Sequence, residues 1–197
     1  MNSLDTPLKI QQFLDSVRYA GEERNRSPLN VLRERQAHCL DGGIFGATAM
    51  RRIGYPPLLI DLLPEPGADD DHILVIYRVG NGWGALAKSN YVGLRWREPV
   101  YRNLRELFMS YFETFFNVNG TRTLRRITRP VNLARFDAWE WEWSDAGGDK
   151  IEKYFKSLRG RAIFTAEQVA AFTPGDEASL KAGLLIANPA GLYQPKI

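Results

Sequence analysis

Cysteine is almost missing from this sequence: Cys39 is the only one among 197 residues. A single cysteine excludes an internal disulfide framework. Histidine is nearly as scarce, because only His38 and His72 occur. A catalytic zinc site normally takes three protein ligands, and one cysteine with two histidines makes such a site improbable. We therefore expect no bound metal and no cofactor.

Long apolar runs are also missing. No window approaches the roughly 20 apolar residues that a transmembrane helix requires. The N-terminal residues 1–6 lack the basic start and apolar run of a signal peptide. We expect a cytoplasmic protein with no membrane partner. The composition, 44% hydrophobic and 25% charged, is typical of a globular domain that can bury a sizeable core.

The net charge of +3 is too slight to indicate a nucleic-acid partner by itself. Basic residues do cluster in the ranges 95–105 and 122–129. Glu98, Glu106 and Glu113 lie close to these clusters, so a solvated face of paired charges is the better interpretation. We expect no binding of nucleic acid.

The most informative stretch is residues 36–54, which contains Cys39. Apolar or very small residues fill 40–49 at positions typical of a helix that is buried nearly all round. Arg51 and Arg52, followed by Gly54, are the signals with which such a helix ends. The pattern therefore predicts a helix that carries Cys39 at its N-terminus.

Two interpretations of Cys39 follow from this position. The N–H groups and dipole at a helix N-terminus favour negative charge, which would make the thiol a plausible nucleophile. Free cysteines are, however, among the most buried residues, and Cys39 can equally be a small hydrophobic residue of the core. Only other residues of the chain decide between these two interpretations.

Strands and turns follow the central helix. The apolar run 58–63 between prolines predicts a buried strand, and a second strand is predicted over 72–79. Gly80–Gly82 is typical of a hairpin turn, so a third strand over 83–90 should pair antiparallel with the second. Other patterns predict helices at 5–17, 27–35, 98–115, 150–158, 165–168 and from 173, and a strand at 139–143.

These elements predict an α+β fold in which the helix that begins at Cys39 packs on an antiparallel sheet. Residues 1–130 should form the core with its N-terminal helices, and 131–197 an extension with further helices that packs on the core. Trp139, Trp141 and Trp143 alternate along the predicted strand. They can cover the sheet or bind a ligand, and packing is the favoured interpretation.

His72 begins the second predicted strand and can meet Cys39 if that strand faces the helix. Cys39 would then attack a carboxamide or ester carbonyl, and His72 would accept the thiol proton and protonate the leaving amine. The backbone N–H of Cys39 can contribute to an oxyanion hole. A residue of the third strand would hold the other ring nitrogen of His72.

The order of a cysteine-bearing helix, a strand that begins with histidine and a strand with tryptophan resembles the core of the transglutaminase-like superfamily. The resemblance covers residues 27–95. The resemblance rests on Cys39 with its small-residue helix, on the stretch 71–77 that contains His72, and on 82–86 with Trp83. It implies a papain-like Cys-His-Asp or Cys-His-Asn site, and it is closer to bacterial members of unassigned activity than to the calcium-activated cross-linking enzymes.

The sequence departs from that family at the third site residue. No aspartate or glutamate lies between His72 and Arg97, so Asn90 is our choice for the residue that orients His72, with Ser89 as a weaker alternative. Around this triad we place Trp83 and Ser89 at the substrate. Gln36 is either an oxyanion donor or a simple surface residue.

Two further groups are given structural roles. His38 is adjacent to Cys39 and should face solvent or cap the helix, since neighbours on a helix diverge by about 100°. The run Asp69–Asp71 can favour a protonated His72 or bind a cation, but it lacks the patterned ligands of a calcium loop. A solvated turn is the better interpretation.

Two functions are consistent with these residues. The first is amide hydrolysis or acyl transfer through a Cys39 thioester, with a peptide or protein amide as substrate and water or a small amine as acceptor. The second is a catalytically inactive member of the same fold that binds a peptide or protein. The missing carboxylate favours the second function, and the presence of both Cys39 and His72 favours the first.

Overall fold

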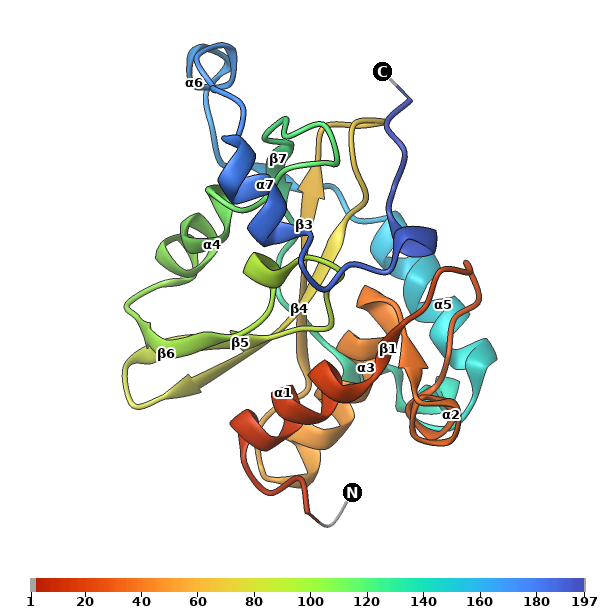
Figure 1. Ribbon diagram of the computed structural model, residues 1–197. Helices are drawn as coiled ribbons and strands as arrows, with labels where there is room; N and C mark the ends of the chain where they lie inside the picture. The colour runs from red at the N-terminus through yellow and green to blue at the C-terminus, as the bar shows by residue number, and fades with distance from the viewer. Residues whose placement is uncertain (1–2, 197) are drawn as a thin grey trace.

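The computed structural model describes residues 3–196 and shows an α+β fold with a mostly antiparallel sheet (Figure 1). The main sheet has the strand order β6-β5-β4-β3-β7-β9, and β8 also pairs with β3. Every pair in this sheet is antiparallel. Its strands are β3 (Leu58–Pro64), β4 (His72–Val79), β5 (Gly82–Leu86), β6 (Arg97–Tyr101), β7 (Leu124–Ile127), β8 (Val131–Asn132) and β9 (Arg161–Ala162). The α+β prediction is thereby confirmed.

The remaining elements are helices and one small parallel sheet. The α-helices are α1 (Pro7–Ser16), α2 (Pro28–Glu34), α3 (Cys39–Arg52), α4 (Leu104–Phe112), α5 (Asp145–Lys156), α6 (Ala166–Ala170) and α7 (Glu177–Gly183). The 3₁₀ helices are η1 (Val92–Leu94), η2 (Leu133–Trp139) and η3 (Pro189–Gly191). Strands β1 (Arg18–Tyr19) and β2 (Gln36–Ala37) pair with each other outside the main sheet.

Helices cover both faces of the main sheet. Helices α1, α3 and α5 pack on one face, and α4 packs on the other. Successive side chains of a strand point to opposite faces. On β4, Ile73 and Val75 accordingly join the core on the α3 side, whereas Leu74 and Ile76 join the core on the α4 side. The position of a β4 residue in this alternation decides which core it enters.

Helix α3 confirms the helix predicted from residue 39 onward. His38 caps its first turn, and Gly54, with a φ of 93°, follows its last turn. Small residues let the helix approach the sheet closely: a Cβ at Gly43 would lie 2.4 Å from Ile73 Cγ2, and one at Gly46 would lie 2.7 Å from Leu86 Cδ1. Cys39 is therefore fixed where the helix meets the sheet.

The helix predicted over 98–115 begins later than expected. Its first residues instead form β6, an edge strand of the sheet, where Pro99 is tolerated. The helix α4 begins after Asn103, whose side chain accepts a hydrogen bond from the backbone N–H of Glu106 at 2.9 Å. The asparagine N-cap, rather than the proline, starts this helix.

The strand predicted at 139–143 is wrong. Trp139 ends η2, and Glu140 has a left-handed backbone with a φ of 56° that turns the chain. Trp139 stacks on Phe136 and Trp141 is buried, whereas Trp143 is 59% exposed. The alternation of three tryptophans thus arises in a turn, where two of them pack against the core.

Three other boundaries complete the C-terminal part of the fold. Helix α5 starts at Asp145, earlier than the predicted 150, and α7 starts after its N-cap Asp176 rather than at Thr173. The capping box of Thr165 and Gln168 is confirmed at the start of α6. Beyond residue 130 the chain also adds β8 and β9 to the main sheet.

Candidate functional site

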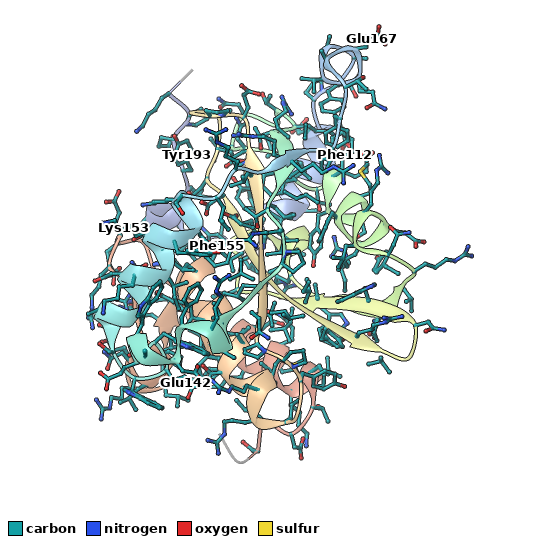
Figure 2. The ribbon with its side chains drawn as sticks, turned by 180° about the vertical axis from the view of Figure 1, so that it is seen from behind. Phe112, Glu142, Lys153, Phe155, Glu167 and Tyr193 are labelled. Carbon is teal, nitrogen blue, oxygen red and sulfur yellow. The ribbon has the colours of Figure 1, made fainter. Side chains whose placement is uncertain are left out.

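A cleft of about 530 Å³ opens at the N-terminus of α3. Its walls come from five parts of the chain: residues 19–23 with Asn25, residues 38–40, the sheet residues Asp61 and Ile73 with the loop that precedes β4, the C-terminal end of α5, and residues 190–193. Figure 2 labels Phe155 and Tyr193, which lie on two of these walls. The predicted nucleophile Cys39 lines this cleft.

The surroundings of Cys39 disfavour the thiolate. The residue is 6% exposed, and its Sγ lies 3.8 Å from the carbonyl oxygen of Asp71. Burial raises the pKa of the thiol well above its usual value, and the nearby charges of Asp71 and Asp70 raise it further. The backbone N–H of Ile73 lowers the pKa but does not offset these effects, so the neutral thiol is favoured.

His72 lies on the opposite face of the sheet from Cys39. It shares the strand alternation of Leu74, which belongs to the core on the α4 side. Its Nε2 donates a hydrogen bond of 2.6 Å to the carbonyl oxygen of Leu94. Burial lowers the pKa of the imidazole to about 4, which keeps it neutral. The expected Cys39–His72 pair is therefore wrong: Cys39 lines the cleft on the α3 side, whereas His72 bonds to Leu94, a residue of the core on the α4 side.

The role predicted for Asn90, the third site residue, is also wrong. Asn90 donates from Nδ2 to the carbonyl oxygen of Asn188 and accepts from the backbone N–H of the same residue, at 2.9 and 2.7 Å. Its role is to fasten the C-terminal segment, and it does not orient His72. Ser89 is buried, and its Oγ accepts from the backbone N–H of Tyr91 at 3.0 Å. The loop after β5 thus uses both side chains structurally.

Gln36 and Trp83 do not line the cleft. Gln36 donates to Glu22 at 2.9 Å and accepts from Arg18, so the surface role is the correct interpretation. Trp83 lies near the start of β5, opposite Arg78, at the end of the β4–β5 hairpin remote from His72. The substrate-binding roles expected for these two side chains have no basis in the structure.

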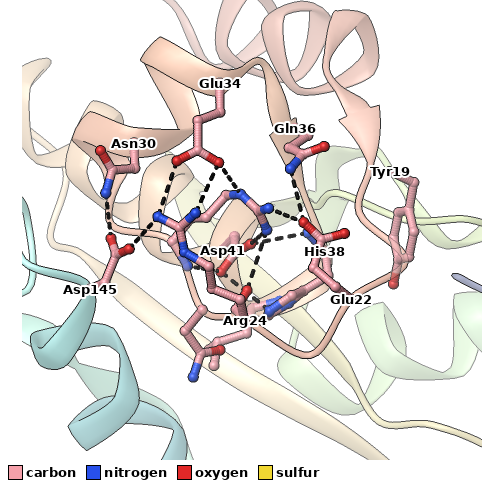
Figure 3. Close-up of polar contacts among 12 residues, drawn as sticks. Tyr19, Glu22, Arg24, Asn30, Glu34, Gln36, His38, Asp41 and Asp145 are labelled. Atoms are coloured by element: carbon pink, nitrogen blue, oxygen red, sulfur yellow. Dashed lines mark hydrogen bonds and ion pairs between the residues drawn. The ribbon is translucent and has the colours of Figure 1, made fainter.

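A network of charged side chains, with Arg26 and Asp41 buried at its centre, surrounds the N-terminus of α3 (Figure 3). Arg26 is 1% exposed and pairs with Glu22 and Glu34, while its backbone N–H donates to Asp41 at 2.6 Å. His38 caps the helix: its Nδ1 accepts from the backbone N–H of Leu40 at 3.2 Å. Burial and the charge of Arg26 lower the pKa of His38 to about 4. The predicted capping role of His38 is confirmed. Because its Nδ1 is used in the cap, His38 is not free to act as a base for Cys39.

Asp61 is the site residue that the sequence reasoning missed. It lies on β3, faces the α3 side together with Leu59, and is 2% exposed. Its Oδ1 is buried and has no hydrogen-bond partner among residues 3–196. Burial and the charges of Asp71 and Asp70 raise its pKa well above the usual value. Asp61 is the one charged residue in the apolar run 58–63, and this was the signal for it.

The run Asp69–Asp71 is only partly the solvated turn that was expected. Asp70 is exposed, but Asp69 and Asp71 are half-buried. The Oγ1 of Thr123 donates to Asp69 at 2.7 Å. Burial and the charge of Asp70 raise the pKa of Asp71 to about 7. Acidic groups from this loop therefore extend the carboxyl cluster that begins at Asp61.

Replacement of Asp61 by asparagine should make stability less dependent on pH. The folded-state pKa of Asp61 is raised, so the folded protein holds this proton to higher pH than the unfolded chain. The stability of the wild type should therefore fall, relative to D61N, as pH rises from about 4 towards neutral. Urea denaturation at several pH values measures this difference. A wild type that gains stability over D61N in this window would contradict the buried state of the carboxyl.

Metal and membrane sites receive no support among residues 3–196. No group of three or more histidine, cysteine, aspartate or glutamate side chains there can hold a metal ion. None of the helices in that part of the chain has the length and apolar character needed to cross a bilayer.

No protein-family model matches the chain, and no curated protein matches it in sequence.

Proposed function

We propose that the protein is a binding module with a transglutaminase-like fold, which holds a peptide segment in the Cys39 cleft without cleaving it. The observation that carries this proposal is the separation of Cys39 and His72 by the sheet. A cleft at Cys39 remains, but its one imidazole among the described residues, His38, caps α3 and is not free to act as the base that thioester chemistry requires.

The order of elements supports the transglutaminase-like fold. A helix with cysteine at its start is followed by β3, by β4 with histidine at its first position, and by the antiparallel β5. The resemblance implies this same order. The proposal retains the fold and departs from the family in the chemistry of the site.

Amide hydrolysis or acyl transfer is the weaker candidate for three reasons. Burial and the neighbouring carboxyls raise the pKa of the Cys39 thiol, and the backbone N–H of Ile73 offsets only part of this effect. His38 is engaged in capping α3. Asn90 is engaged with Asn188 and does not orient an imidazole.

The reactivity of Cys39 tests the catalytic part of this proposal. Because the thiol is buried beside carboxyls, its rate of alkylation by iodoacetamide should rise only above the ordinary thiol pKa of about 8.5. His72→Asn should leave this pH profile unchanged, since His72 lies behind the sheet. His38→Asn, which retains a capping side chain, is the matched control.

Binding is tested on the same thiol. Capped tripeptide amides that differ only in the middle residue should slow the alkylation of Cys39, and intact-protein mass spectrometry should detect no acyl adduct. A profile with an inflection well below pH 8.5 that moves upward in His72→Asn would overturn the proposal. So would an acyl adduct on Cys39, or a panel in which no peptide protects the thiol.

A further inference from the structure

Asp61 has a position that folding alone does not explain. Buried polar atoms almost always have hydrogen-bond partners, and leaving one without a partner costs about 1–3 kcal/mol. The carboxyl of Asp61 is 2% exposed, yet its Oδ1 has no partner among the described residues. Because Asp61 also lines the cleft, a donor group of a bound ligand can supply the missing hydrogen bond.

The charge around Asp61 indicates the sign of that ligand. The cleft is lined by the carboxyl groups of Glu22, Glu23, Asp61, Asp70, Asp71 and Glu152. Lys156 is the only lysine or arginine in the lining, and its Nζ is paired with Glu152 at 2.5 Å. Glu22 is neutralised by Arg26. No salt bridge within 4 Å joins Asp61 or Asp71 to a basic side chain among residues 3–196, and only the more distant charge of Lys156 acts on Asp71. Carboxyls outnumber basic groups in the lining, so the site favours a cation.

The arrangement of the two carboxyls favours an ammonium over a guanidinium. Asp61 pairs with Ile73 across β3 and β4, so Asp61 and Asp71 occupy diagonal positions on the same face of the sheet. An ammonium carries three donors at one point and can bond single oxygens of two different carboxyls. A guanidinium presents a planar fork that suits both oxygens of one open carboxylate. The buried Oδ1 of Asp61 does not offer that geometry.

The walls above Asp61 suit an alkyl chain. Leu40, Ile73, Phe155 and Leu192 line the cleft together with the acidic groups. Aliphatic stems of basic side chains pack on apolar surface while the charged end reaches a polar group. A site with apolar walls and a carboxyl at its buried end therefore matches a lysine-type side chain.

From these contacts we infer that the cleft recognises an alkylammonium group, such as a lysine side chain of a bound peptide, with Asp61 as its counter-ion. The inference rests on the proposed binding function and names the group that this function recognises. Asp61 releases its retained proton to solvent when the ammonium binds, since a cation beside a carboxyl favours its ionised form. The ammonium then donates to the free oxygen of Asp61 and to Asp71, and no covalent bond forms.

Calorimetric titration with Ac-Gly-Lys-Gly-NH₂ and with its norleucine and arginine analogues tests the inference. The lysine peptide should bind the wild type about tenfold or more tightly than the norleucine peptide, because only its ammonium completes the hydrogen bond to Asp61. In Asp61→Asn the lysine peptide should lose about tenfold in affinity, whereas binding of the norleucine peptide should not change. Glu98→Gln, an exposed carboxyl outside the cleft, is the charge-matched control.

The outcomes separate this inference from the proposed function. If the peptides bind but lysine and norleucine are equivalent, or if Asp61→Asn has no effect, the ammonium site is excluded and the binding function stands. Tighter binding of the arginine peptide excludes the preference for ammonium. If no peptide binds, both proposals fail. Should Asp61→Asn not fold, the comparison of the three peptides on the wild type decides alone.

Discussion

Urea denaturation of Arg26→Met at pH 7 should show a loss of about 3–5 kcal/mol in the free energy of unfolding. The guanidinium of Arg26 is buried and pairs with Glu22 and Glu34, and its Nη1 lies 3.6 Å from Asp41 Oδ2. Asp41 is completely buried. Methionine fills a similar volume but removes the cation beside Asp41, whose pKa burial already raises to about 7. The variant must bury an unpaired carboxylate or protonate it and weaken its hydrogen bonds, and both are costly.

Arg24→Met is the matched control for this measurement. Arg24 belongs to the same network, where it pairs with Glu34 and Asp145, but its side chain is about half exposed. Exposed ion pairs contribute little, so the expected loss is below about 1 kcal/mol. Equal losses of unfolding free energy in the two variants would contradict the prediction that the buried ion pairs of Arg26 stabilise the fold more than exposed ones.

The second large effect is expected from Gly43→Ala. A Cβ at residue 43 would lie 2.4 Å from Ile73 Cγ2, inside the contact distance that side chains tolerate. Helix α3 would have to move away from β4, and overpacking of this kind typically costs about 1–3 kcal/mol. Thermal and urea denaturation should both detect the loss. Because Cys39 is the first residue of α3, the rate of Cys39 alkylation should also rise when the helix moves away from the sheet.

Gly148→Ala provides the opposite expectation with the same chemical change. Gly148 is also a buried helical glycine, in α5, but a Cβ there would meet Asn25 Cβ at 3.6 Å and Ile44 Cδ1 at 3.9 Å, which are ordinary contacts. Alanine should therefore stabilise this helix by about 0.5–1 kcal/mol. If Gly43→Ala were also stabilising, α3 would not pack as closely on the sheet as the structure shows.

Elements with strong local signals could be predicted from the sequence. Helix α3 was predicted with its N-terminus at Cys39 because small and apolar residues, terminal arginines and Gly54 all agree. The turn at Gly80 similarly determined the antiparallel β4–β5 pair. Where two local signals competed, as with Pro99 and Asn103 before α4, the tertiary position of β6 decided the boundary.

The face on which His72 lies could not be predicted. Residues 72–77 are all buried, because helices cover both faces of the sheet. A strand that is apolar on both sides has no polar alternation to show which face each residue takes. The contacts of Ile73 with Gly43 and of His72 with Leu94 determine which face each residue takes. Both contacts join parts of the chain that are distant in sequence.

The far wall of the cleft has a consequence during translation. Residues 190–193, held in place through the bonds between Asn90 and Asn188, are synthesised roughly 150 positions after Cys39. At about 5–20 residues per second, the ribosome needs roughly 8–30 s to cover that distance. Throughout this interval the nascent chain lacks one side of the cleft, so the cleft is complete only after residues 190–193 have been synthesised and have left the ribosome.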